Sequence, residues 1–339
     1  MKRVVLIPSY EPNDNLVKLV NELKKENVDI IIVNDGSNNT YDKIYKKIDK
    51  DIIYLKYDNN MGKGYAIKYG LKYIKDNYKN CNIVTMDSDG QHRVEDAIKL
   101  LNMVDNDNTL YLGKRLRDNK IPFKSKIGNV FSRIVFRLST HKDIYDTQTG
   151  LRSFNSNLIS ILLDVEGNRF DYEMNVLYKL IDNNINIIEE EINTIYEDGN
   201  KGTHFRMLKD SFLVYKKLFM FIISSISSFI IDYGLYVLFN ILGIKVIISN
   251  ILARIVSSIY NYLFNRNIVF KDNKDYYKTI FKYYSLAIFI LLMNSILLYI
   301  FVNVLCFNKY IMKIIIDTIL FIVSYFIQNN KIFKKRRIK

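Results

Sequence analysis

The residues with the clearest capacity for chemistry are two carboxylates, Asp87 and Asp89, which directly follow the apolar run 81–86. The run predicts a buried strand. Alternate residues of a strand point to the same side, so the two acids can converge while Gly90 lets the backbone turn away. Converging carboxylates repel each other unless a cation or a proton lies between them. A hard divalent metal bridging to phosphate is the usual solution, and the alternative is a plain surface turn.

Polar clusters also follow other apolar runs that are expected to be strands, at 8–11, 34–37 and 113–115. In an open α/β sheet the ligand binds at the carboxyl ends of the strands. The clusters mix acids, bases and an aromatic ring. Together with the acids that follow 81–86, they predict one site for a charged ligand that carries a flat ring.

The elements that must position these residues alternate along the chain. Strands are expected at 3–7, 29–33, 52–57, 81–86 and 109–112, and Pro8 is expected to stop the first of them. Helical spacing of apolar residues occurs at 13–26, 41–48, 60–75 and 95–104. This alternation predicts an α/β fold with a parallel sheet and helices on both of its faces.

The composition changes sharply near residue 218. Beyond it come long apolar stretches at about 218–242, 246–264, 283–305 and 311–327. Each approaches the roughly 20 residues that span a bilayer. The 339-residue chain is therefore expected to join a soluble domain, 1–217, to an all-α four-span membrane domain, 218–339, with a basic C-terminal tail. The last part of the first domain, about 199–217, is expected to be a juxtamembrane segment.

The 49 Lys and Arg residues outnumber the 35 Asp and Glu residues, which gives a net charge of +14. Such an excess suggests an anionic partner. Basic residues gather at 266–282 and 331–339, so the positive-inside rule predicts a protein of the cell membrane with both termini in the cytoplasm. Much of the excess then belongs to membrane anchoring, and no nucleic-acid partner is expected. Cys81 and Cys306 lie in different predicted domains, which argues against a disulfide framework.

A series of short motifs runs in order across about 1–217. Together they resemble glycosyltransferase family 2, and within it the polyprenyl-phosphate sugar transferases of the dolichyl-phosphate mannose synthase type. The motifs are Ile7-Pro8-Ser9-Tyr10, Asn34-Asp35-Gly36-Ser37, Asn60-Met61-Gly62-Lys63-Gly64, Asp87-Ser88-Asp89-Gly90-Gln91-His92, Gly113-Lys114-Arg115, Asp146-Thr147-Gln148-Thr149-Gly150-Leu151-Arg152 and Phe170-Asp171-Tyr172-Glu173-Met174.

The resemblance implies a GT-A (Rossmann-like) fold that binds a nucleotide-sugar. Pro8, Tyr10 and Asp35 would hold the base and ribose. Relatives often carry an acid two residues after the tyrosine, where this chain has Pro12, so Glu11 would take over that contact. The implied donor-binding set is Pro8, Tyr10, Glu11, Asp35, Lys63 and Asp87.

The resemblance also implies a catalytic set of Asp89, Arg115 and Asp146. Asp89 and Gln91 would bind Mg²⁺ or Mn²⁺, which stabilises the negative charge that develops on a departing diphosphate. Arg115 would face the phosphate of the acceptor. That phosphate is already ionised at neutral pH, so no general base is nominated. Asp146 and Glu173 are candidates for positioning, and a helix N-terminal acid is the alternative for Glu173.

Other basic side chains remain candidates. Lys126, or its neighbour Lys124, would contact the acceptor phosphate. Lys201 and His204 could form a lid over the diphosphate, although a solvated loop histidine is an equal alternative for His204. His92 stays unassigned.

The second half resembles the GtrA-like membrane domain, whose members are associated with handling lipid-linked sugars. Asp232 is expected to pair with Arg254, because ionisable groups inside a bilayer face the bundle interior or each other. A structural clamp between helices is the favoured role for this pair. The residues that carry the resemblance are 229–235, Asn250, Ala253 and 260–270.

These features predict a metal-dependent, inverting hexosyltransferase. It would move a hexose from a UDP- or GDP-sugar to undecaprenyl or dolichyl phosphate at the cytoplasmic membrane face, in cell-surface glycan biosynthesis. The absence of tryptophan argues against a processive polysaccharide synthase, whose characteristic motif contains one. The alternatives are a non-enzymatic lipid-linked-sugar flippase or scaffold, and a transferase that acts on another glycolipid. A homo-oligomer is left open.

Overall fold

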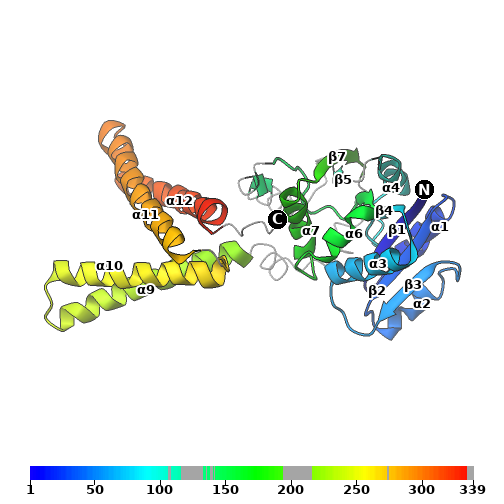
Figure 1. Cartoon of the computed structure of the whole chain (residues 1–339), viewed down its shortest axis with the longest axis horizontal. Helices are drawn as coiled ribbons and strands as arrows, with labels where there is room; N and C mark the ends of the chain where they lie inside the picture. The colour runs from blue at the N-terminus through cyan, green and yellow to red at the C-terminus, as the bar shows by residue number, and fades with distance from the viewer. Residues whose placement is uncertain are drawn as a thin grey trace. The chain divides into compact units, whose positions relative to one another are not determined.

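A computed structural model of the chain divides into two compact units, Met1–Val214 and Tyr215–Lys339. The structure describes residues 1–105, 108–115, 133–134, 136–137, 140, 142–193, 216–272 and 275–333. In its described part, the first unit combines strands with helices, and the second is helical (Figure 1). Several predictions lie outside the described residues: those for Lys124, Lys126, Lys201, His204 and nearly all of the segment 199–217.

The first unit is built on a seven-stranded sheet with the spatial order β3-β2-β1-β4-β6-β5-β7. Its neighbouring strands are parallel except at β6, which is antiparallel to both β4 and β5. The strands that the sequence predicted all run parallel to one another, but the sheet is mixed because of β6, which was not predicted. Its four residues carry no apolar run that would reveal a strand. The strands are β1 (Lys2–Ser9), β2 (Asp29–Asp35), β3 (Ile53–Tyr57), β4 (Cys81–Thr85), β5 (Thr109–Arg115), β6 (Arg152–Asn155) and β7 (Asn186–Ile192).

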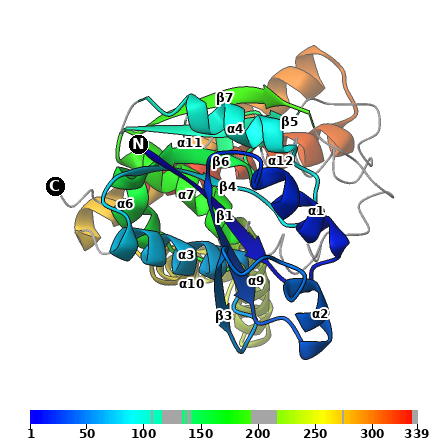
Figure 2. The same cartoon turned by 90° about the vertical axis from the view of Figure 1, so that its right-hand side faces the viewer.

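Helices cover both faces of the sheet, as the sequence predicted (Figure 2). Alternate residues of β1 separate the two cores: Leu6 packs with α3, α6 and α7, whereas Ile7 packs with α1 and α4. Each face therefore has its own buried apolar cluster. The helices are α1 (Asp14–Leu23), α2 (Asp42–Tyr45), α3 (Lys63–Asn77), α4 (Val94–Asn102), α6 (Ile159–Leu163) and α7 (Asp171–Asp182).

Strand β1 continues through Pro8 to Ser9, which corrects the expectation that Pro8 stops it. Pro8 is in register with Val33 of β2, whereas the pairing of β1 with β4 ends at Leu6. At Pro8 the strand is thus paired on one side only, where a missing N–H can be tolerated. β1 and β2 therefore stay paired as far as Ser9 and Asn34, next to the polar residues that follow each strand.

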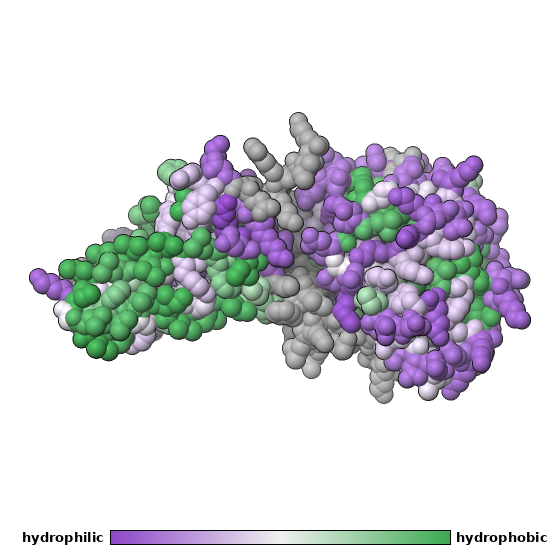
Figure 3. Space-filling view, turned by 60° about the horizontal axis from the view of Figure 1, so that its bottom comes forward, coloured by the Kyte–Doolittle hydropathy of each residue, from purple (hydrophilic) through white to green (hydrophobic). Residues whose placement is uncertain are grey.

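The second unit contains helices at each of the apolar stretches: α9 (Lys216–Ile241), α10 (Val246–Phe264), α11 (Tyr276–Leu298) and α12 (Lys309–Ile327). Apolar side chains cover much of its surface (Figure 3). Phe229 and Ile230, for example, are 67% and 63% exposed. An apolar surface of this kind suits lipid contact.

Two segments of the second unit, Lys217–Ile241 and Tyr276–Phe301, are long and apolar enough to cross a membrane by length and composition. The helices α10 and α12, of 19 residues each, are not among the segments that meet these conditions of length and composition. The helical prediction is therefore confirmed, while the count of four spans stays a prediction.

Helix α9 packs along α10, and α11 packs along α12. The two pairs meet through a buried cluster that includes Phe221 and Phe270. Between α9 and α10, Arg254 Nη2 lies 3.2 Å from Asp232 Oδ2, which confirms the predicted pair. Ser257 Oγ also donates to Asp232 Oδ1, at 2.8 Å. These contacts fit the role of a polar clamp between neighbouring helices.

Candidate active site

The first unit gathers opposite charges where β4 ends. Lys63, the first residue of α3, places its Nζ 2.6 Å from Asp87 Oδ1 and 2.7 Å from Glu173 Oε1. Glu173 stands in the first turn of α7 and is 3% exposed. An ammonium group thus bridges carboxylates from two separate elements, and Lys63 offsets the repulsion that two nearby buried acids would otherwise suffer.

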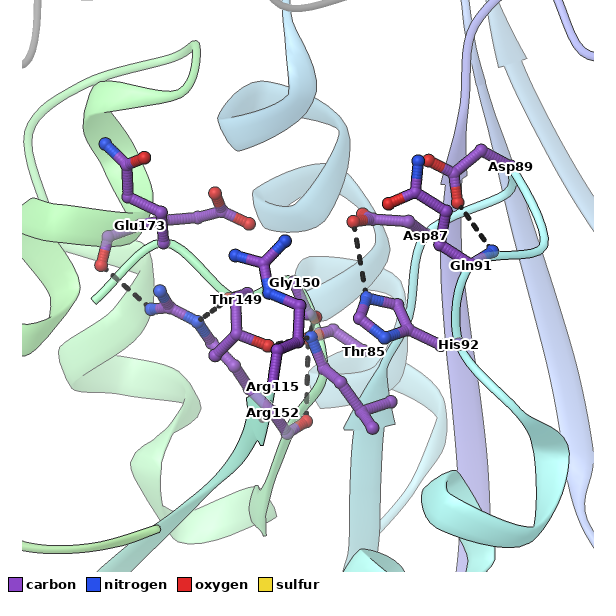
Figure 4. Close-up of polar contacts among 12 residues, drawn as sticks. Thr85, Asp87, Asp89, Gln91, His92, Arg115, Thr149, Gly150, Arg152 and Glu173 are labelled. Atoms are coloured by element: carbon purple, nitrogen blue, oxygen red, sulfur yellow. Dashed lines mark hydrogen bonds and ion pairs between the residues drawn. The ribbon is translucent and has the colours of Figure 1, made fainter. Parts of the chain in front are cut away.

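His92 completes the surroundings of Asp87. Its Nε2 lies 3.6 Å from Asp87 Oδ2, and the side chain is buried at 5% exposure (Figure 4). The ring therefore faces the strand end rather than solvent. Its Nδ1 is buried and has no hydrogen-bond partner among the residues that the structure describes. His92 and Lys63 together hold the Asp87 carboxylate from two directions.

The two acids of the strand end have opposite pKa shifts. Burial alone would raise the pKa of Asp87, but the positive charge of Lys63 and the contact with His92 lower it well below its usual range. Burial raises the pKa of Asp89, and the negative charge of Asp87 adds to that effect. Lys63 keeps its proton, because the two carboxylates raise its pKa against the opposite effect of burial. The Asp89 carboxyl therefore ionises less readily than the Asp87 carboxyl, as their opposite pKa shifts indicate.

Asp89 and Gln91 form a tight turn that Gly90 makes possible. Gln91 N–H donates to Asp89 Oδ1 at 3.0 Å, and Asn15 Nδ2 donates to the Asp89 carbonyl at 3.1 Å. Gly90 has a φ of +80°, which favours glycine. Among the described residues, no group of three or more His, Cys, Asp and Glu side chains could hold a metal. The oxygen donors present, two carboxylates and the Gln91 amide, nevertheless fit a hard cation that also takes oxygens from a ligand.

The loop before β6 lies directly against Asp87. A Cβ on Gly150 would stand 2.5 Å from Asp87 Oδ2, so a larger residue there would force the loop or the carboxylate to move. Thr85 Oγ1 donates to the Gly150 carbonyl at 2.9 Å. The buried side chain of Arg152 donates to the carbonyls of Thr149 and Glu173, at 2.9 and 2.8 Å. This arginine therefore ties the loop to the start of α7.

Arg115 and Asp146 meet at the end of β5. The guanidinium donates to Asp146 through Nε and Nη2, at 2.6 and 2.9 Å. Burial alone would raise the pKa of Asp146, but the charge and hydrogen bonds of Arg115 lower it. Glu189 of β7 accepts from the backbone N–H groups of Tyr145 and Asp146 and fixes the turn beneath them. Two members of the predicted catalytic set are thus brought together.

Asp35, at the end of β2, is engaged by the protein itself. It accepts hydrogen bonds from Tyr57 Oη at 2.8 Å, from Asn60 Nδ2 at 3.1 Å and from the N–H groups of Met61 and Gly62. Burial raises the pKa of Asp35 despite these bonds. Gly62 has a φ of +100°, a conformation that favours glycine. Asp35 therefore fixes the residue immediately before Lys63.

Glu11 follows β1 with a φ of +47°, an unusual conformation for a residue with a side chain. Its N–H donates to Ser37 Oγ at 2.8 Å, which joins the ends of β1 and β2. Tyr10 precedes Glu11 in the chain. Burial is the largest cause that raises the pKa of Tyr10, and its hydrogen bond with Glu11 is the second. Tyr10, Glu11 and Asp35 thus lie near one another at the ends of β1 and β2, while Pro8 lies within β1, in register with Val33.

The comparisons with known proteins agree with this geometry. Residues 4–160 match the family model "Glycosyl transferase family 2", and residues 220–333 match "GtrA/DPMS, transmembrane domain". Over 242 residues the chain is 31% identical to the UDP-N-acetylglucosamine–dolichyl-phosphate N-acetylglucosaminyltransferase of Methanococcus voltae, which covers 64% of this chain and 94% of that relative. The chain belongs to glycosyltransferase family 2.

Other family 2 relatives carry related names. The dolichyl-phosphate beta-glucosyltransferase of Dictyostelium discoideum is 30% identical over 61% of this chain and 71% of its own. The dolichol-phosphate mannosyltransferase of Pyrococcus furiosus is 26% identical over 80% of this chain and 82% of its own. The family 2 domain of this chain is thus a GT-A-like mixed α/β sheet domain, followed by a helical membrane-type region.

The family 2 site contains residues that periodicity did not single out. Glu189 lies in β7, a strand that was not predicted, so nothing in the sequence pointed to it. Arg152 was part of a quoted motif but had no assigned role, and its enclosure among carbonyl groups appears only in the fold. Chemically, the site combines acids, an ammonium and a guanidinium at the strand ends, which suits a ligand with several phosphate oxygens.

Proposed function

We propose that this family 2 protein transfers a hexose or N-acetylhexosamine from a UDP- or GDP-sugar to a polyprenyl phosphate at the cytoplasmic membrane face, with inversion. The observation that carries the proposal is the bridge of Lys63 to Asp87 and Glu173 beside Asp89 and Gln91. The names of the relatives support the chemical class, since those cited act on dolichyl or dolichol phosphate. The apolar second unit supports a lipid acceptor.

In the proposed reaction an acceptor phosphate oxygen attacks the anomeric carbon of the donor sugar from the side opposite the nucleotide. The new bond joins that carbon to the phosphate oxygen, and the broken bond releases UDP or GDP with the electron pair. Arg115, held by Asp146, would orient the acceptor phosphate. The charged oxygen needs no base, so the residues serve mainly to position the two anions and to lower their repulsion.

The donor would lie along the strand ends. Pro8, Tyr10, Glu11 and Asp35 form the proposed site for base and ribose, with Asp35 acting partly through the Gly62 turn that it fixes. Lys63 and Asp87 would face the diphosphate region. Asp89 and Gln91 would hold Mg²⁺ or Mn²⁺, which neutralises negative charge on a leaving diphosphate when it is bound. We further propose residues 1–217 as the catalytic domain and 218–339 as its four-span membrane domain.

The test uses the full chain in membranes with polyprenyl phosphate. Labelled UDP-N-acetylglucosamine, UDP-glucose and GDP-mannose are supplied separately, with Mg²⁺ or Mn²⁺ or with a chelator. We expect a labelled lipid from one donor, its loss with chelator, and a drop in kcat of at least about a hundredfold in Asp89→Asn, as typically follows loss of a transition-state charge contact. Absence of a lipid product from every donor, or full activity in the variant, would refute the proposal.

A further inference from the structure

The loop between α6 and α7 lies against the turn from which α3 begins. A Cβ on Gly62 would stand 2.6 Å from Arg169 Cγ and 2.6 Å from the carbonyl oxygen of Asn168. The same turn donates the N–H groups of Met61 and Gly62 to Asp35. Arg169 therefore stands beside the strand end that belongs to the proposed site for base and ribose.

Hydrogen bonds fix the backbone at Arg169. Lys68 of α3 donates through Nζ to Asn168 Oδ1 at 2.8 Å, and the Tyr65 N–H donates to the Asn168 carbonyl at 2.9 Å. The N–H of Arg169 itself donates to Asp171 Oδ1, in the first turn of α7, at 3.0 Å. The loop is thus tied to two helices, so the Arg169 side chain starts from a defined position.

The guanidinium of Arg169 is available for a ligand. Lys63 and Arg115, two other cations of the strand ends, are each bound to acids of the protein. Arg169 is only partly buried, and no acid of the described residues forms an ion pair with its guanidinium. Its charge nevertheless reaches Asp35: burial is the main influence on the pKa of Asp35 and raises it, whereas Arg169 acts in the opposite direction. A guanidinium without an acid partner thus lies near this carboxylate.

Asp35 by itself has little capacity left to recognise a base. Its two oxygens accept hydrogen bonds from Tyr57 Oη, Asn60 Nδ2 and two backbone N–H groups of the Gly62 turn. These bonds occupy about the four lone-pair sites that a carboxylate offers. Recognition of the hydrogen-bonding edge of a base therefore needs a further residue, and Arg169 lies next to Asp35.

A guanidinium selects among nucleobases because it can only donate hydrogen bonds. Uracil and guanine carry a carbonyl oxygen, O4 or O6, where cytosine and adenine carry an amino group that also donates. An arginine that faces this position binds the keto bases, uracil and guanine, and meets the amino bases, cytosine and adenine, donor to donor. Its planar array of N–H groups also suits an oxygen acceptor at a fixed position.

We infer that Arg169 donates to the carbonyl oxygen of the donor's base and makes the site selective for uracil or guanine nucleotides over cytosine and adenine nucleotides. The inference rests on the proposed function for the presence of a nucleotide at these strand ends. It names the residue that distinguishes the base of the donor. Arg169 takes no part in the transfer step, so its effect belongs to donor binding.

The test measures nucleotide binding to the full chain in lipid nanodiscs. Labelled UDP, CDP, GDP and ADP are supplied separately with Mn²⁺, and equilibrium dialysis gives each Kd. UDP is compared with CDP and GDP with ADP, so that ring size stays constant. For the wild type we expect at least one keto nucleotide to bind at least about tenfold more tightly than its amino partner, the size of effect that a hydrogen bond to a charged group gives.

Arg169→Met keeps the apolar stem and removes every donor of the side chain. We expect it to raise the Kd of the preferred keto nucleotide at least about tenfold, and to change that of its amino partner by less than about threefold. Arg169→Lys keeps the charge but not the planar fork, so its preference should lie between those of the wild type and Arg169→Met. Lys72→Met removes a positive charge from an exposed position of α3 and should leave both Kd values unchanged.

Three results would overturn the inference. The wild type could bind both members of each pair equally, Arg169→Met could keep the wild-type preference, or Arg169→Met could weaken binding of all four nucleotides by the same factor. The last result would place the guanidinium on the phosphates instead of the base. If circular dichroism shows that Arg169→Met does not fold, Arg169→Lys decides: it should lower the preference at least about threefold, and an unchanged preference would overturn the inference.

The proposed function is tested separately, because the nucleotides carry no sugar and their binding needs no transfer. Wild-type protein that shows the preference, loses it in Arg169→Met and transfers no sugar from any donor would contradict the proposed function and leave this inference standing. Normal sugar transfer by the wild type, with an unchanged base preference in Arg169→Met, would do the reverse.

Discussion

Lys63 dominates the electrostatics of the strand-end site. It is a single cation shared by two carboxylates, Asp87 and Glu173, that approach from β4 and α7. A buried ion pair gains little over an apolar packing of the same shape, but removing one partner alone leaves an uncompensated charge. The residue therefore links the stability of the domain to the charge state of its proposed donor site.

Lys63→Met should destabilise the first unit, because it leaves Asp87 and Glu173 without their shared cation. We expect the free energy of unfolding to fall by about 3–5 kcal/mol. Chemical denaturation of the full chain in detergent, followed by circular dichroism, measures the change. Lys72→Met, at an exposed position of the same helix, is the control and should stay within about 0.5 kcal/mol. An equal effect of both substitutions would show that the bridge contributes nothing.

The pair Arg115–Asp146 predicts a pH dependence. Burial opposes ionisation of Asp146, but Arg115 outweighs it and lowers the pKa in the folded state. The stabilisation that the Arg115–Asp146 pair provides is therefore complete above the pKa of an aspartate in the unfolded chain, about 3.9. It is lost as the pH falls towards the lower pKa of Asp146 in the folded state. Arg115→Gln should make the stability profile below about pH 4 flatter than that of the wild type, as measured by urea unfolding between pH 6 and pH 3.

Arg133→Gln is the matched control for that profile. Arg133 pairs with Asp143 with the same two-point geometry, at 2.8 Å for each bond, but both side chains are 30% or more exposed. Exposed pairs contribute little. If the stability profile of Arg133→Gln were as flat as that of Arg115→Gln, burial of Asp146 would not be the cause of the pH dependence.

At the scale of elements, the loop before β6 and the start of α3 converge on one carboxylate. Gly150 allows the loop to lie against Asp87, and Arg152 holds that loop to α7. Asp35 fixes the Gly62 turn from which α3 begins. The strand ends thus supply the charged groups, while the loops and helix starts decide their separations.

Gly150→Ala tests the close approach of this loop. The new Cβ would stand 2.5 Å from Asp87 Oδ2, so either the loop or the carboxylate must move. We expect the free energy of unfolding to fall by about 1–3 kcal/mol, as in other overpacked sites, and sugar transfer to fall with it. Gly234→Ala in α9 has open space within 4 Å and serves as the control. It should be neutral or slightly stabilising, since alanine favours helices.

At the scale of the whole molecule, a natural cysteine can report the topology. Cys306 is exposed in the segment between α11 and α12, whereas Cys81 is buried and its burial raises the thiol pKa to about 11. With a cytoplasmic N-terminus, four spans place Cys306 outside the cell. Spans formed by α9 and α11 alone place it inside.

We expect a membrane-impermeant maleimide to label Cys306 in intact cells, in agreement with four spans and the positive-inside rule. Gel-shift analysis measures the labelling, and Cys306→Ser gives the background. Labelling that requires permeabilised cells would exclude the four-span topology with cytoplasmic termini. The same result would favour two crossings by the segments Lys217–Ile241 and Tyr276–Phe301.

The order of the first strands and helices was accessible from the sequence, because period-two and helical apolar patterns depend on neighbouring residues. The same applies to the polar strand ends, to the helices of the second unit and to the pair Asp232–Arg254. β6 was not predicted, because four residues of mixed polarity show no apolar period. Its antiparallel direction depends on its pairing with β4, which is distant in the sequence.

The sequence by itself determined which charged residues stand at the strand ends and that an apolar region follows them. Only the tertiary structure decided how they pair: Lys63 with Asp87 and Glu173, Arg115 with Asp146, and Asp35 with the turn before α3. These partners are far apart along the chain, and Coulomb energies depend on distance and burial rather than on residue type. Of the two acids that began as a metal-site pattern, Asp87 is thus held in the folded chain by a lysine from another element, whereas Asp89 is not.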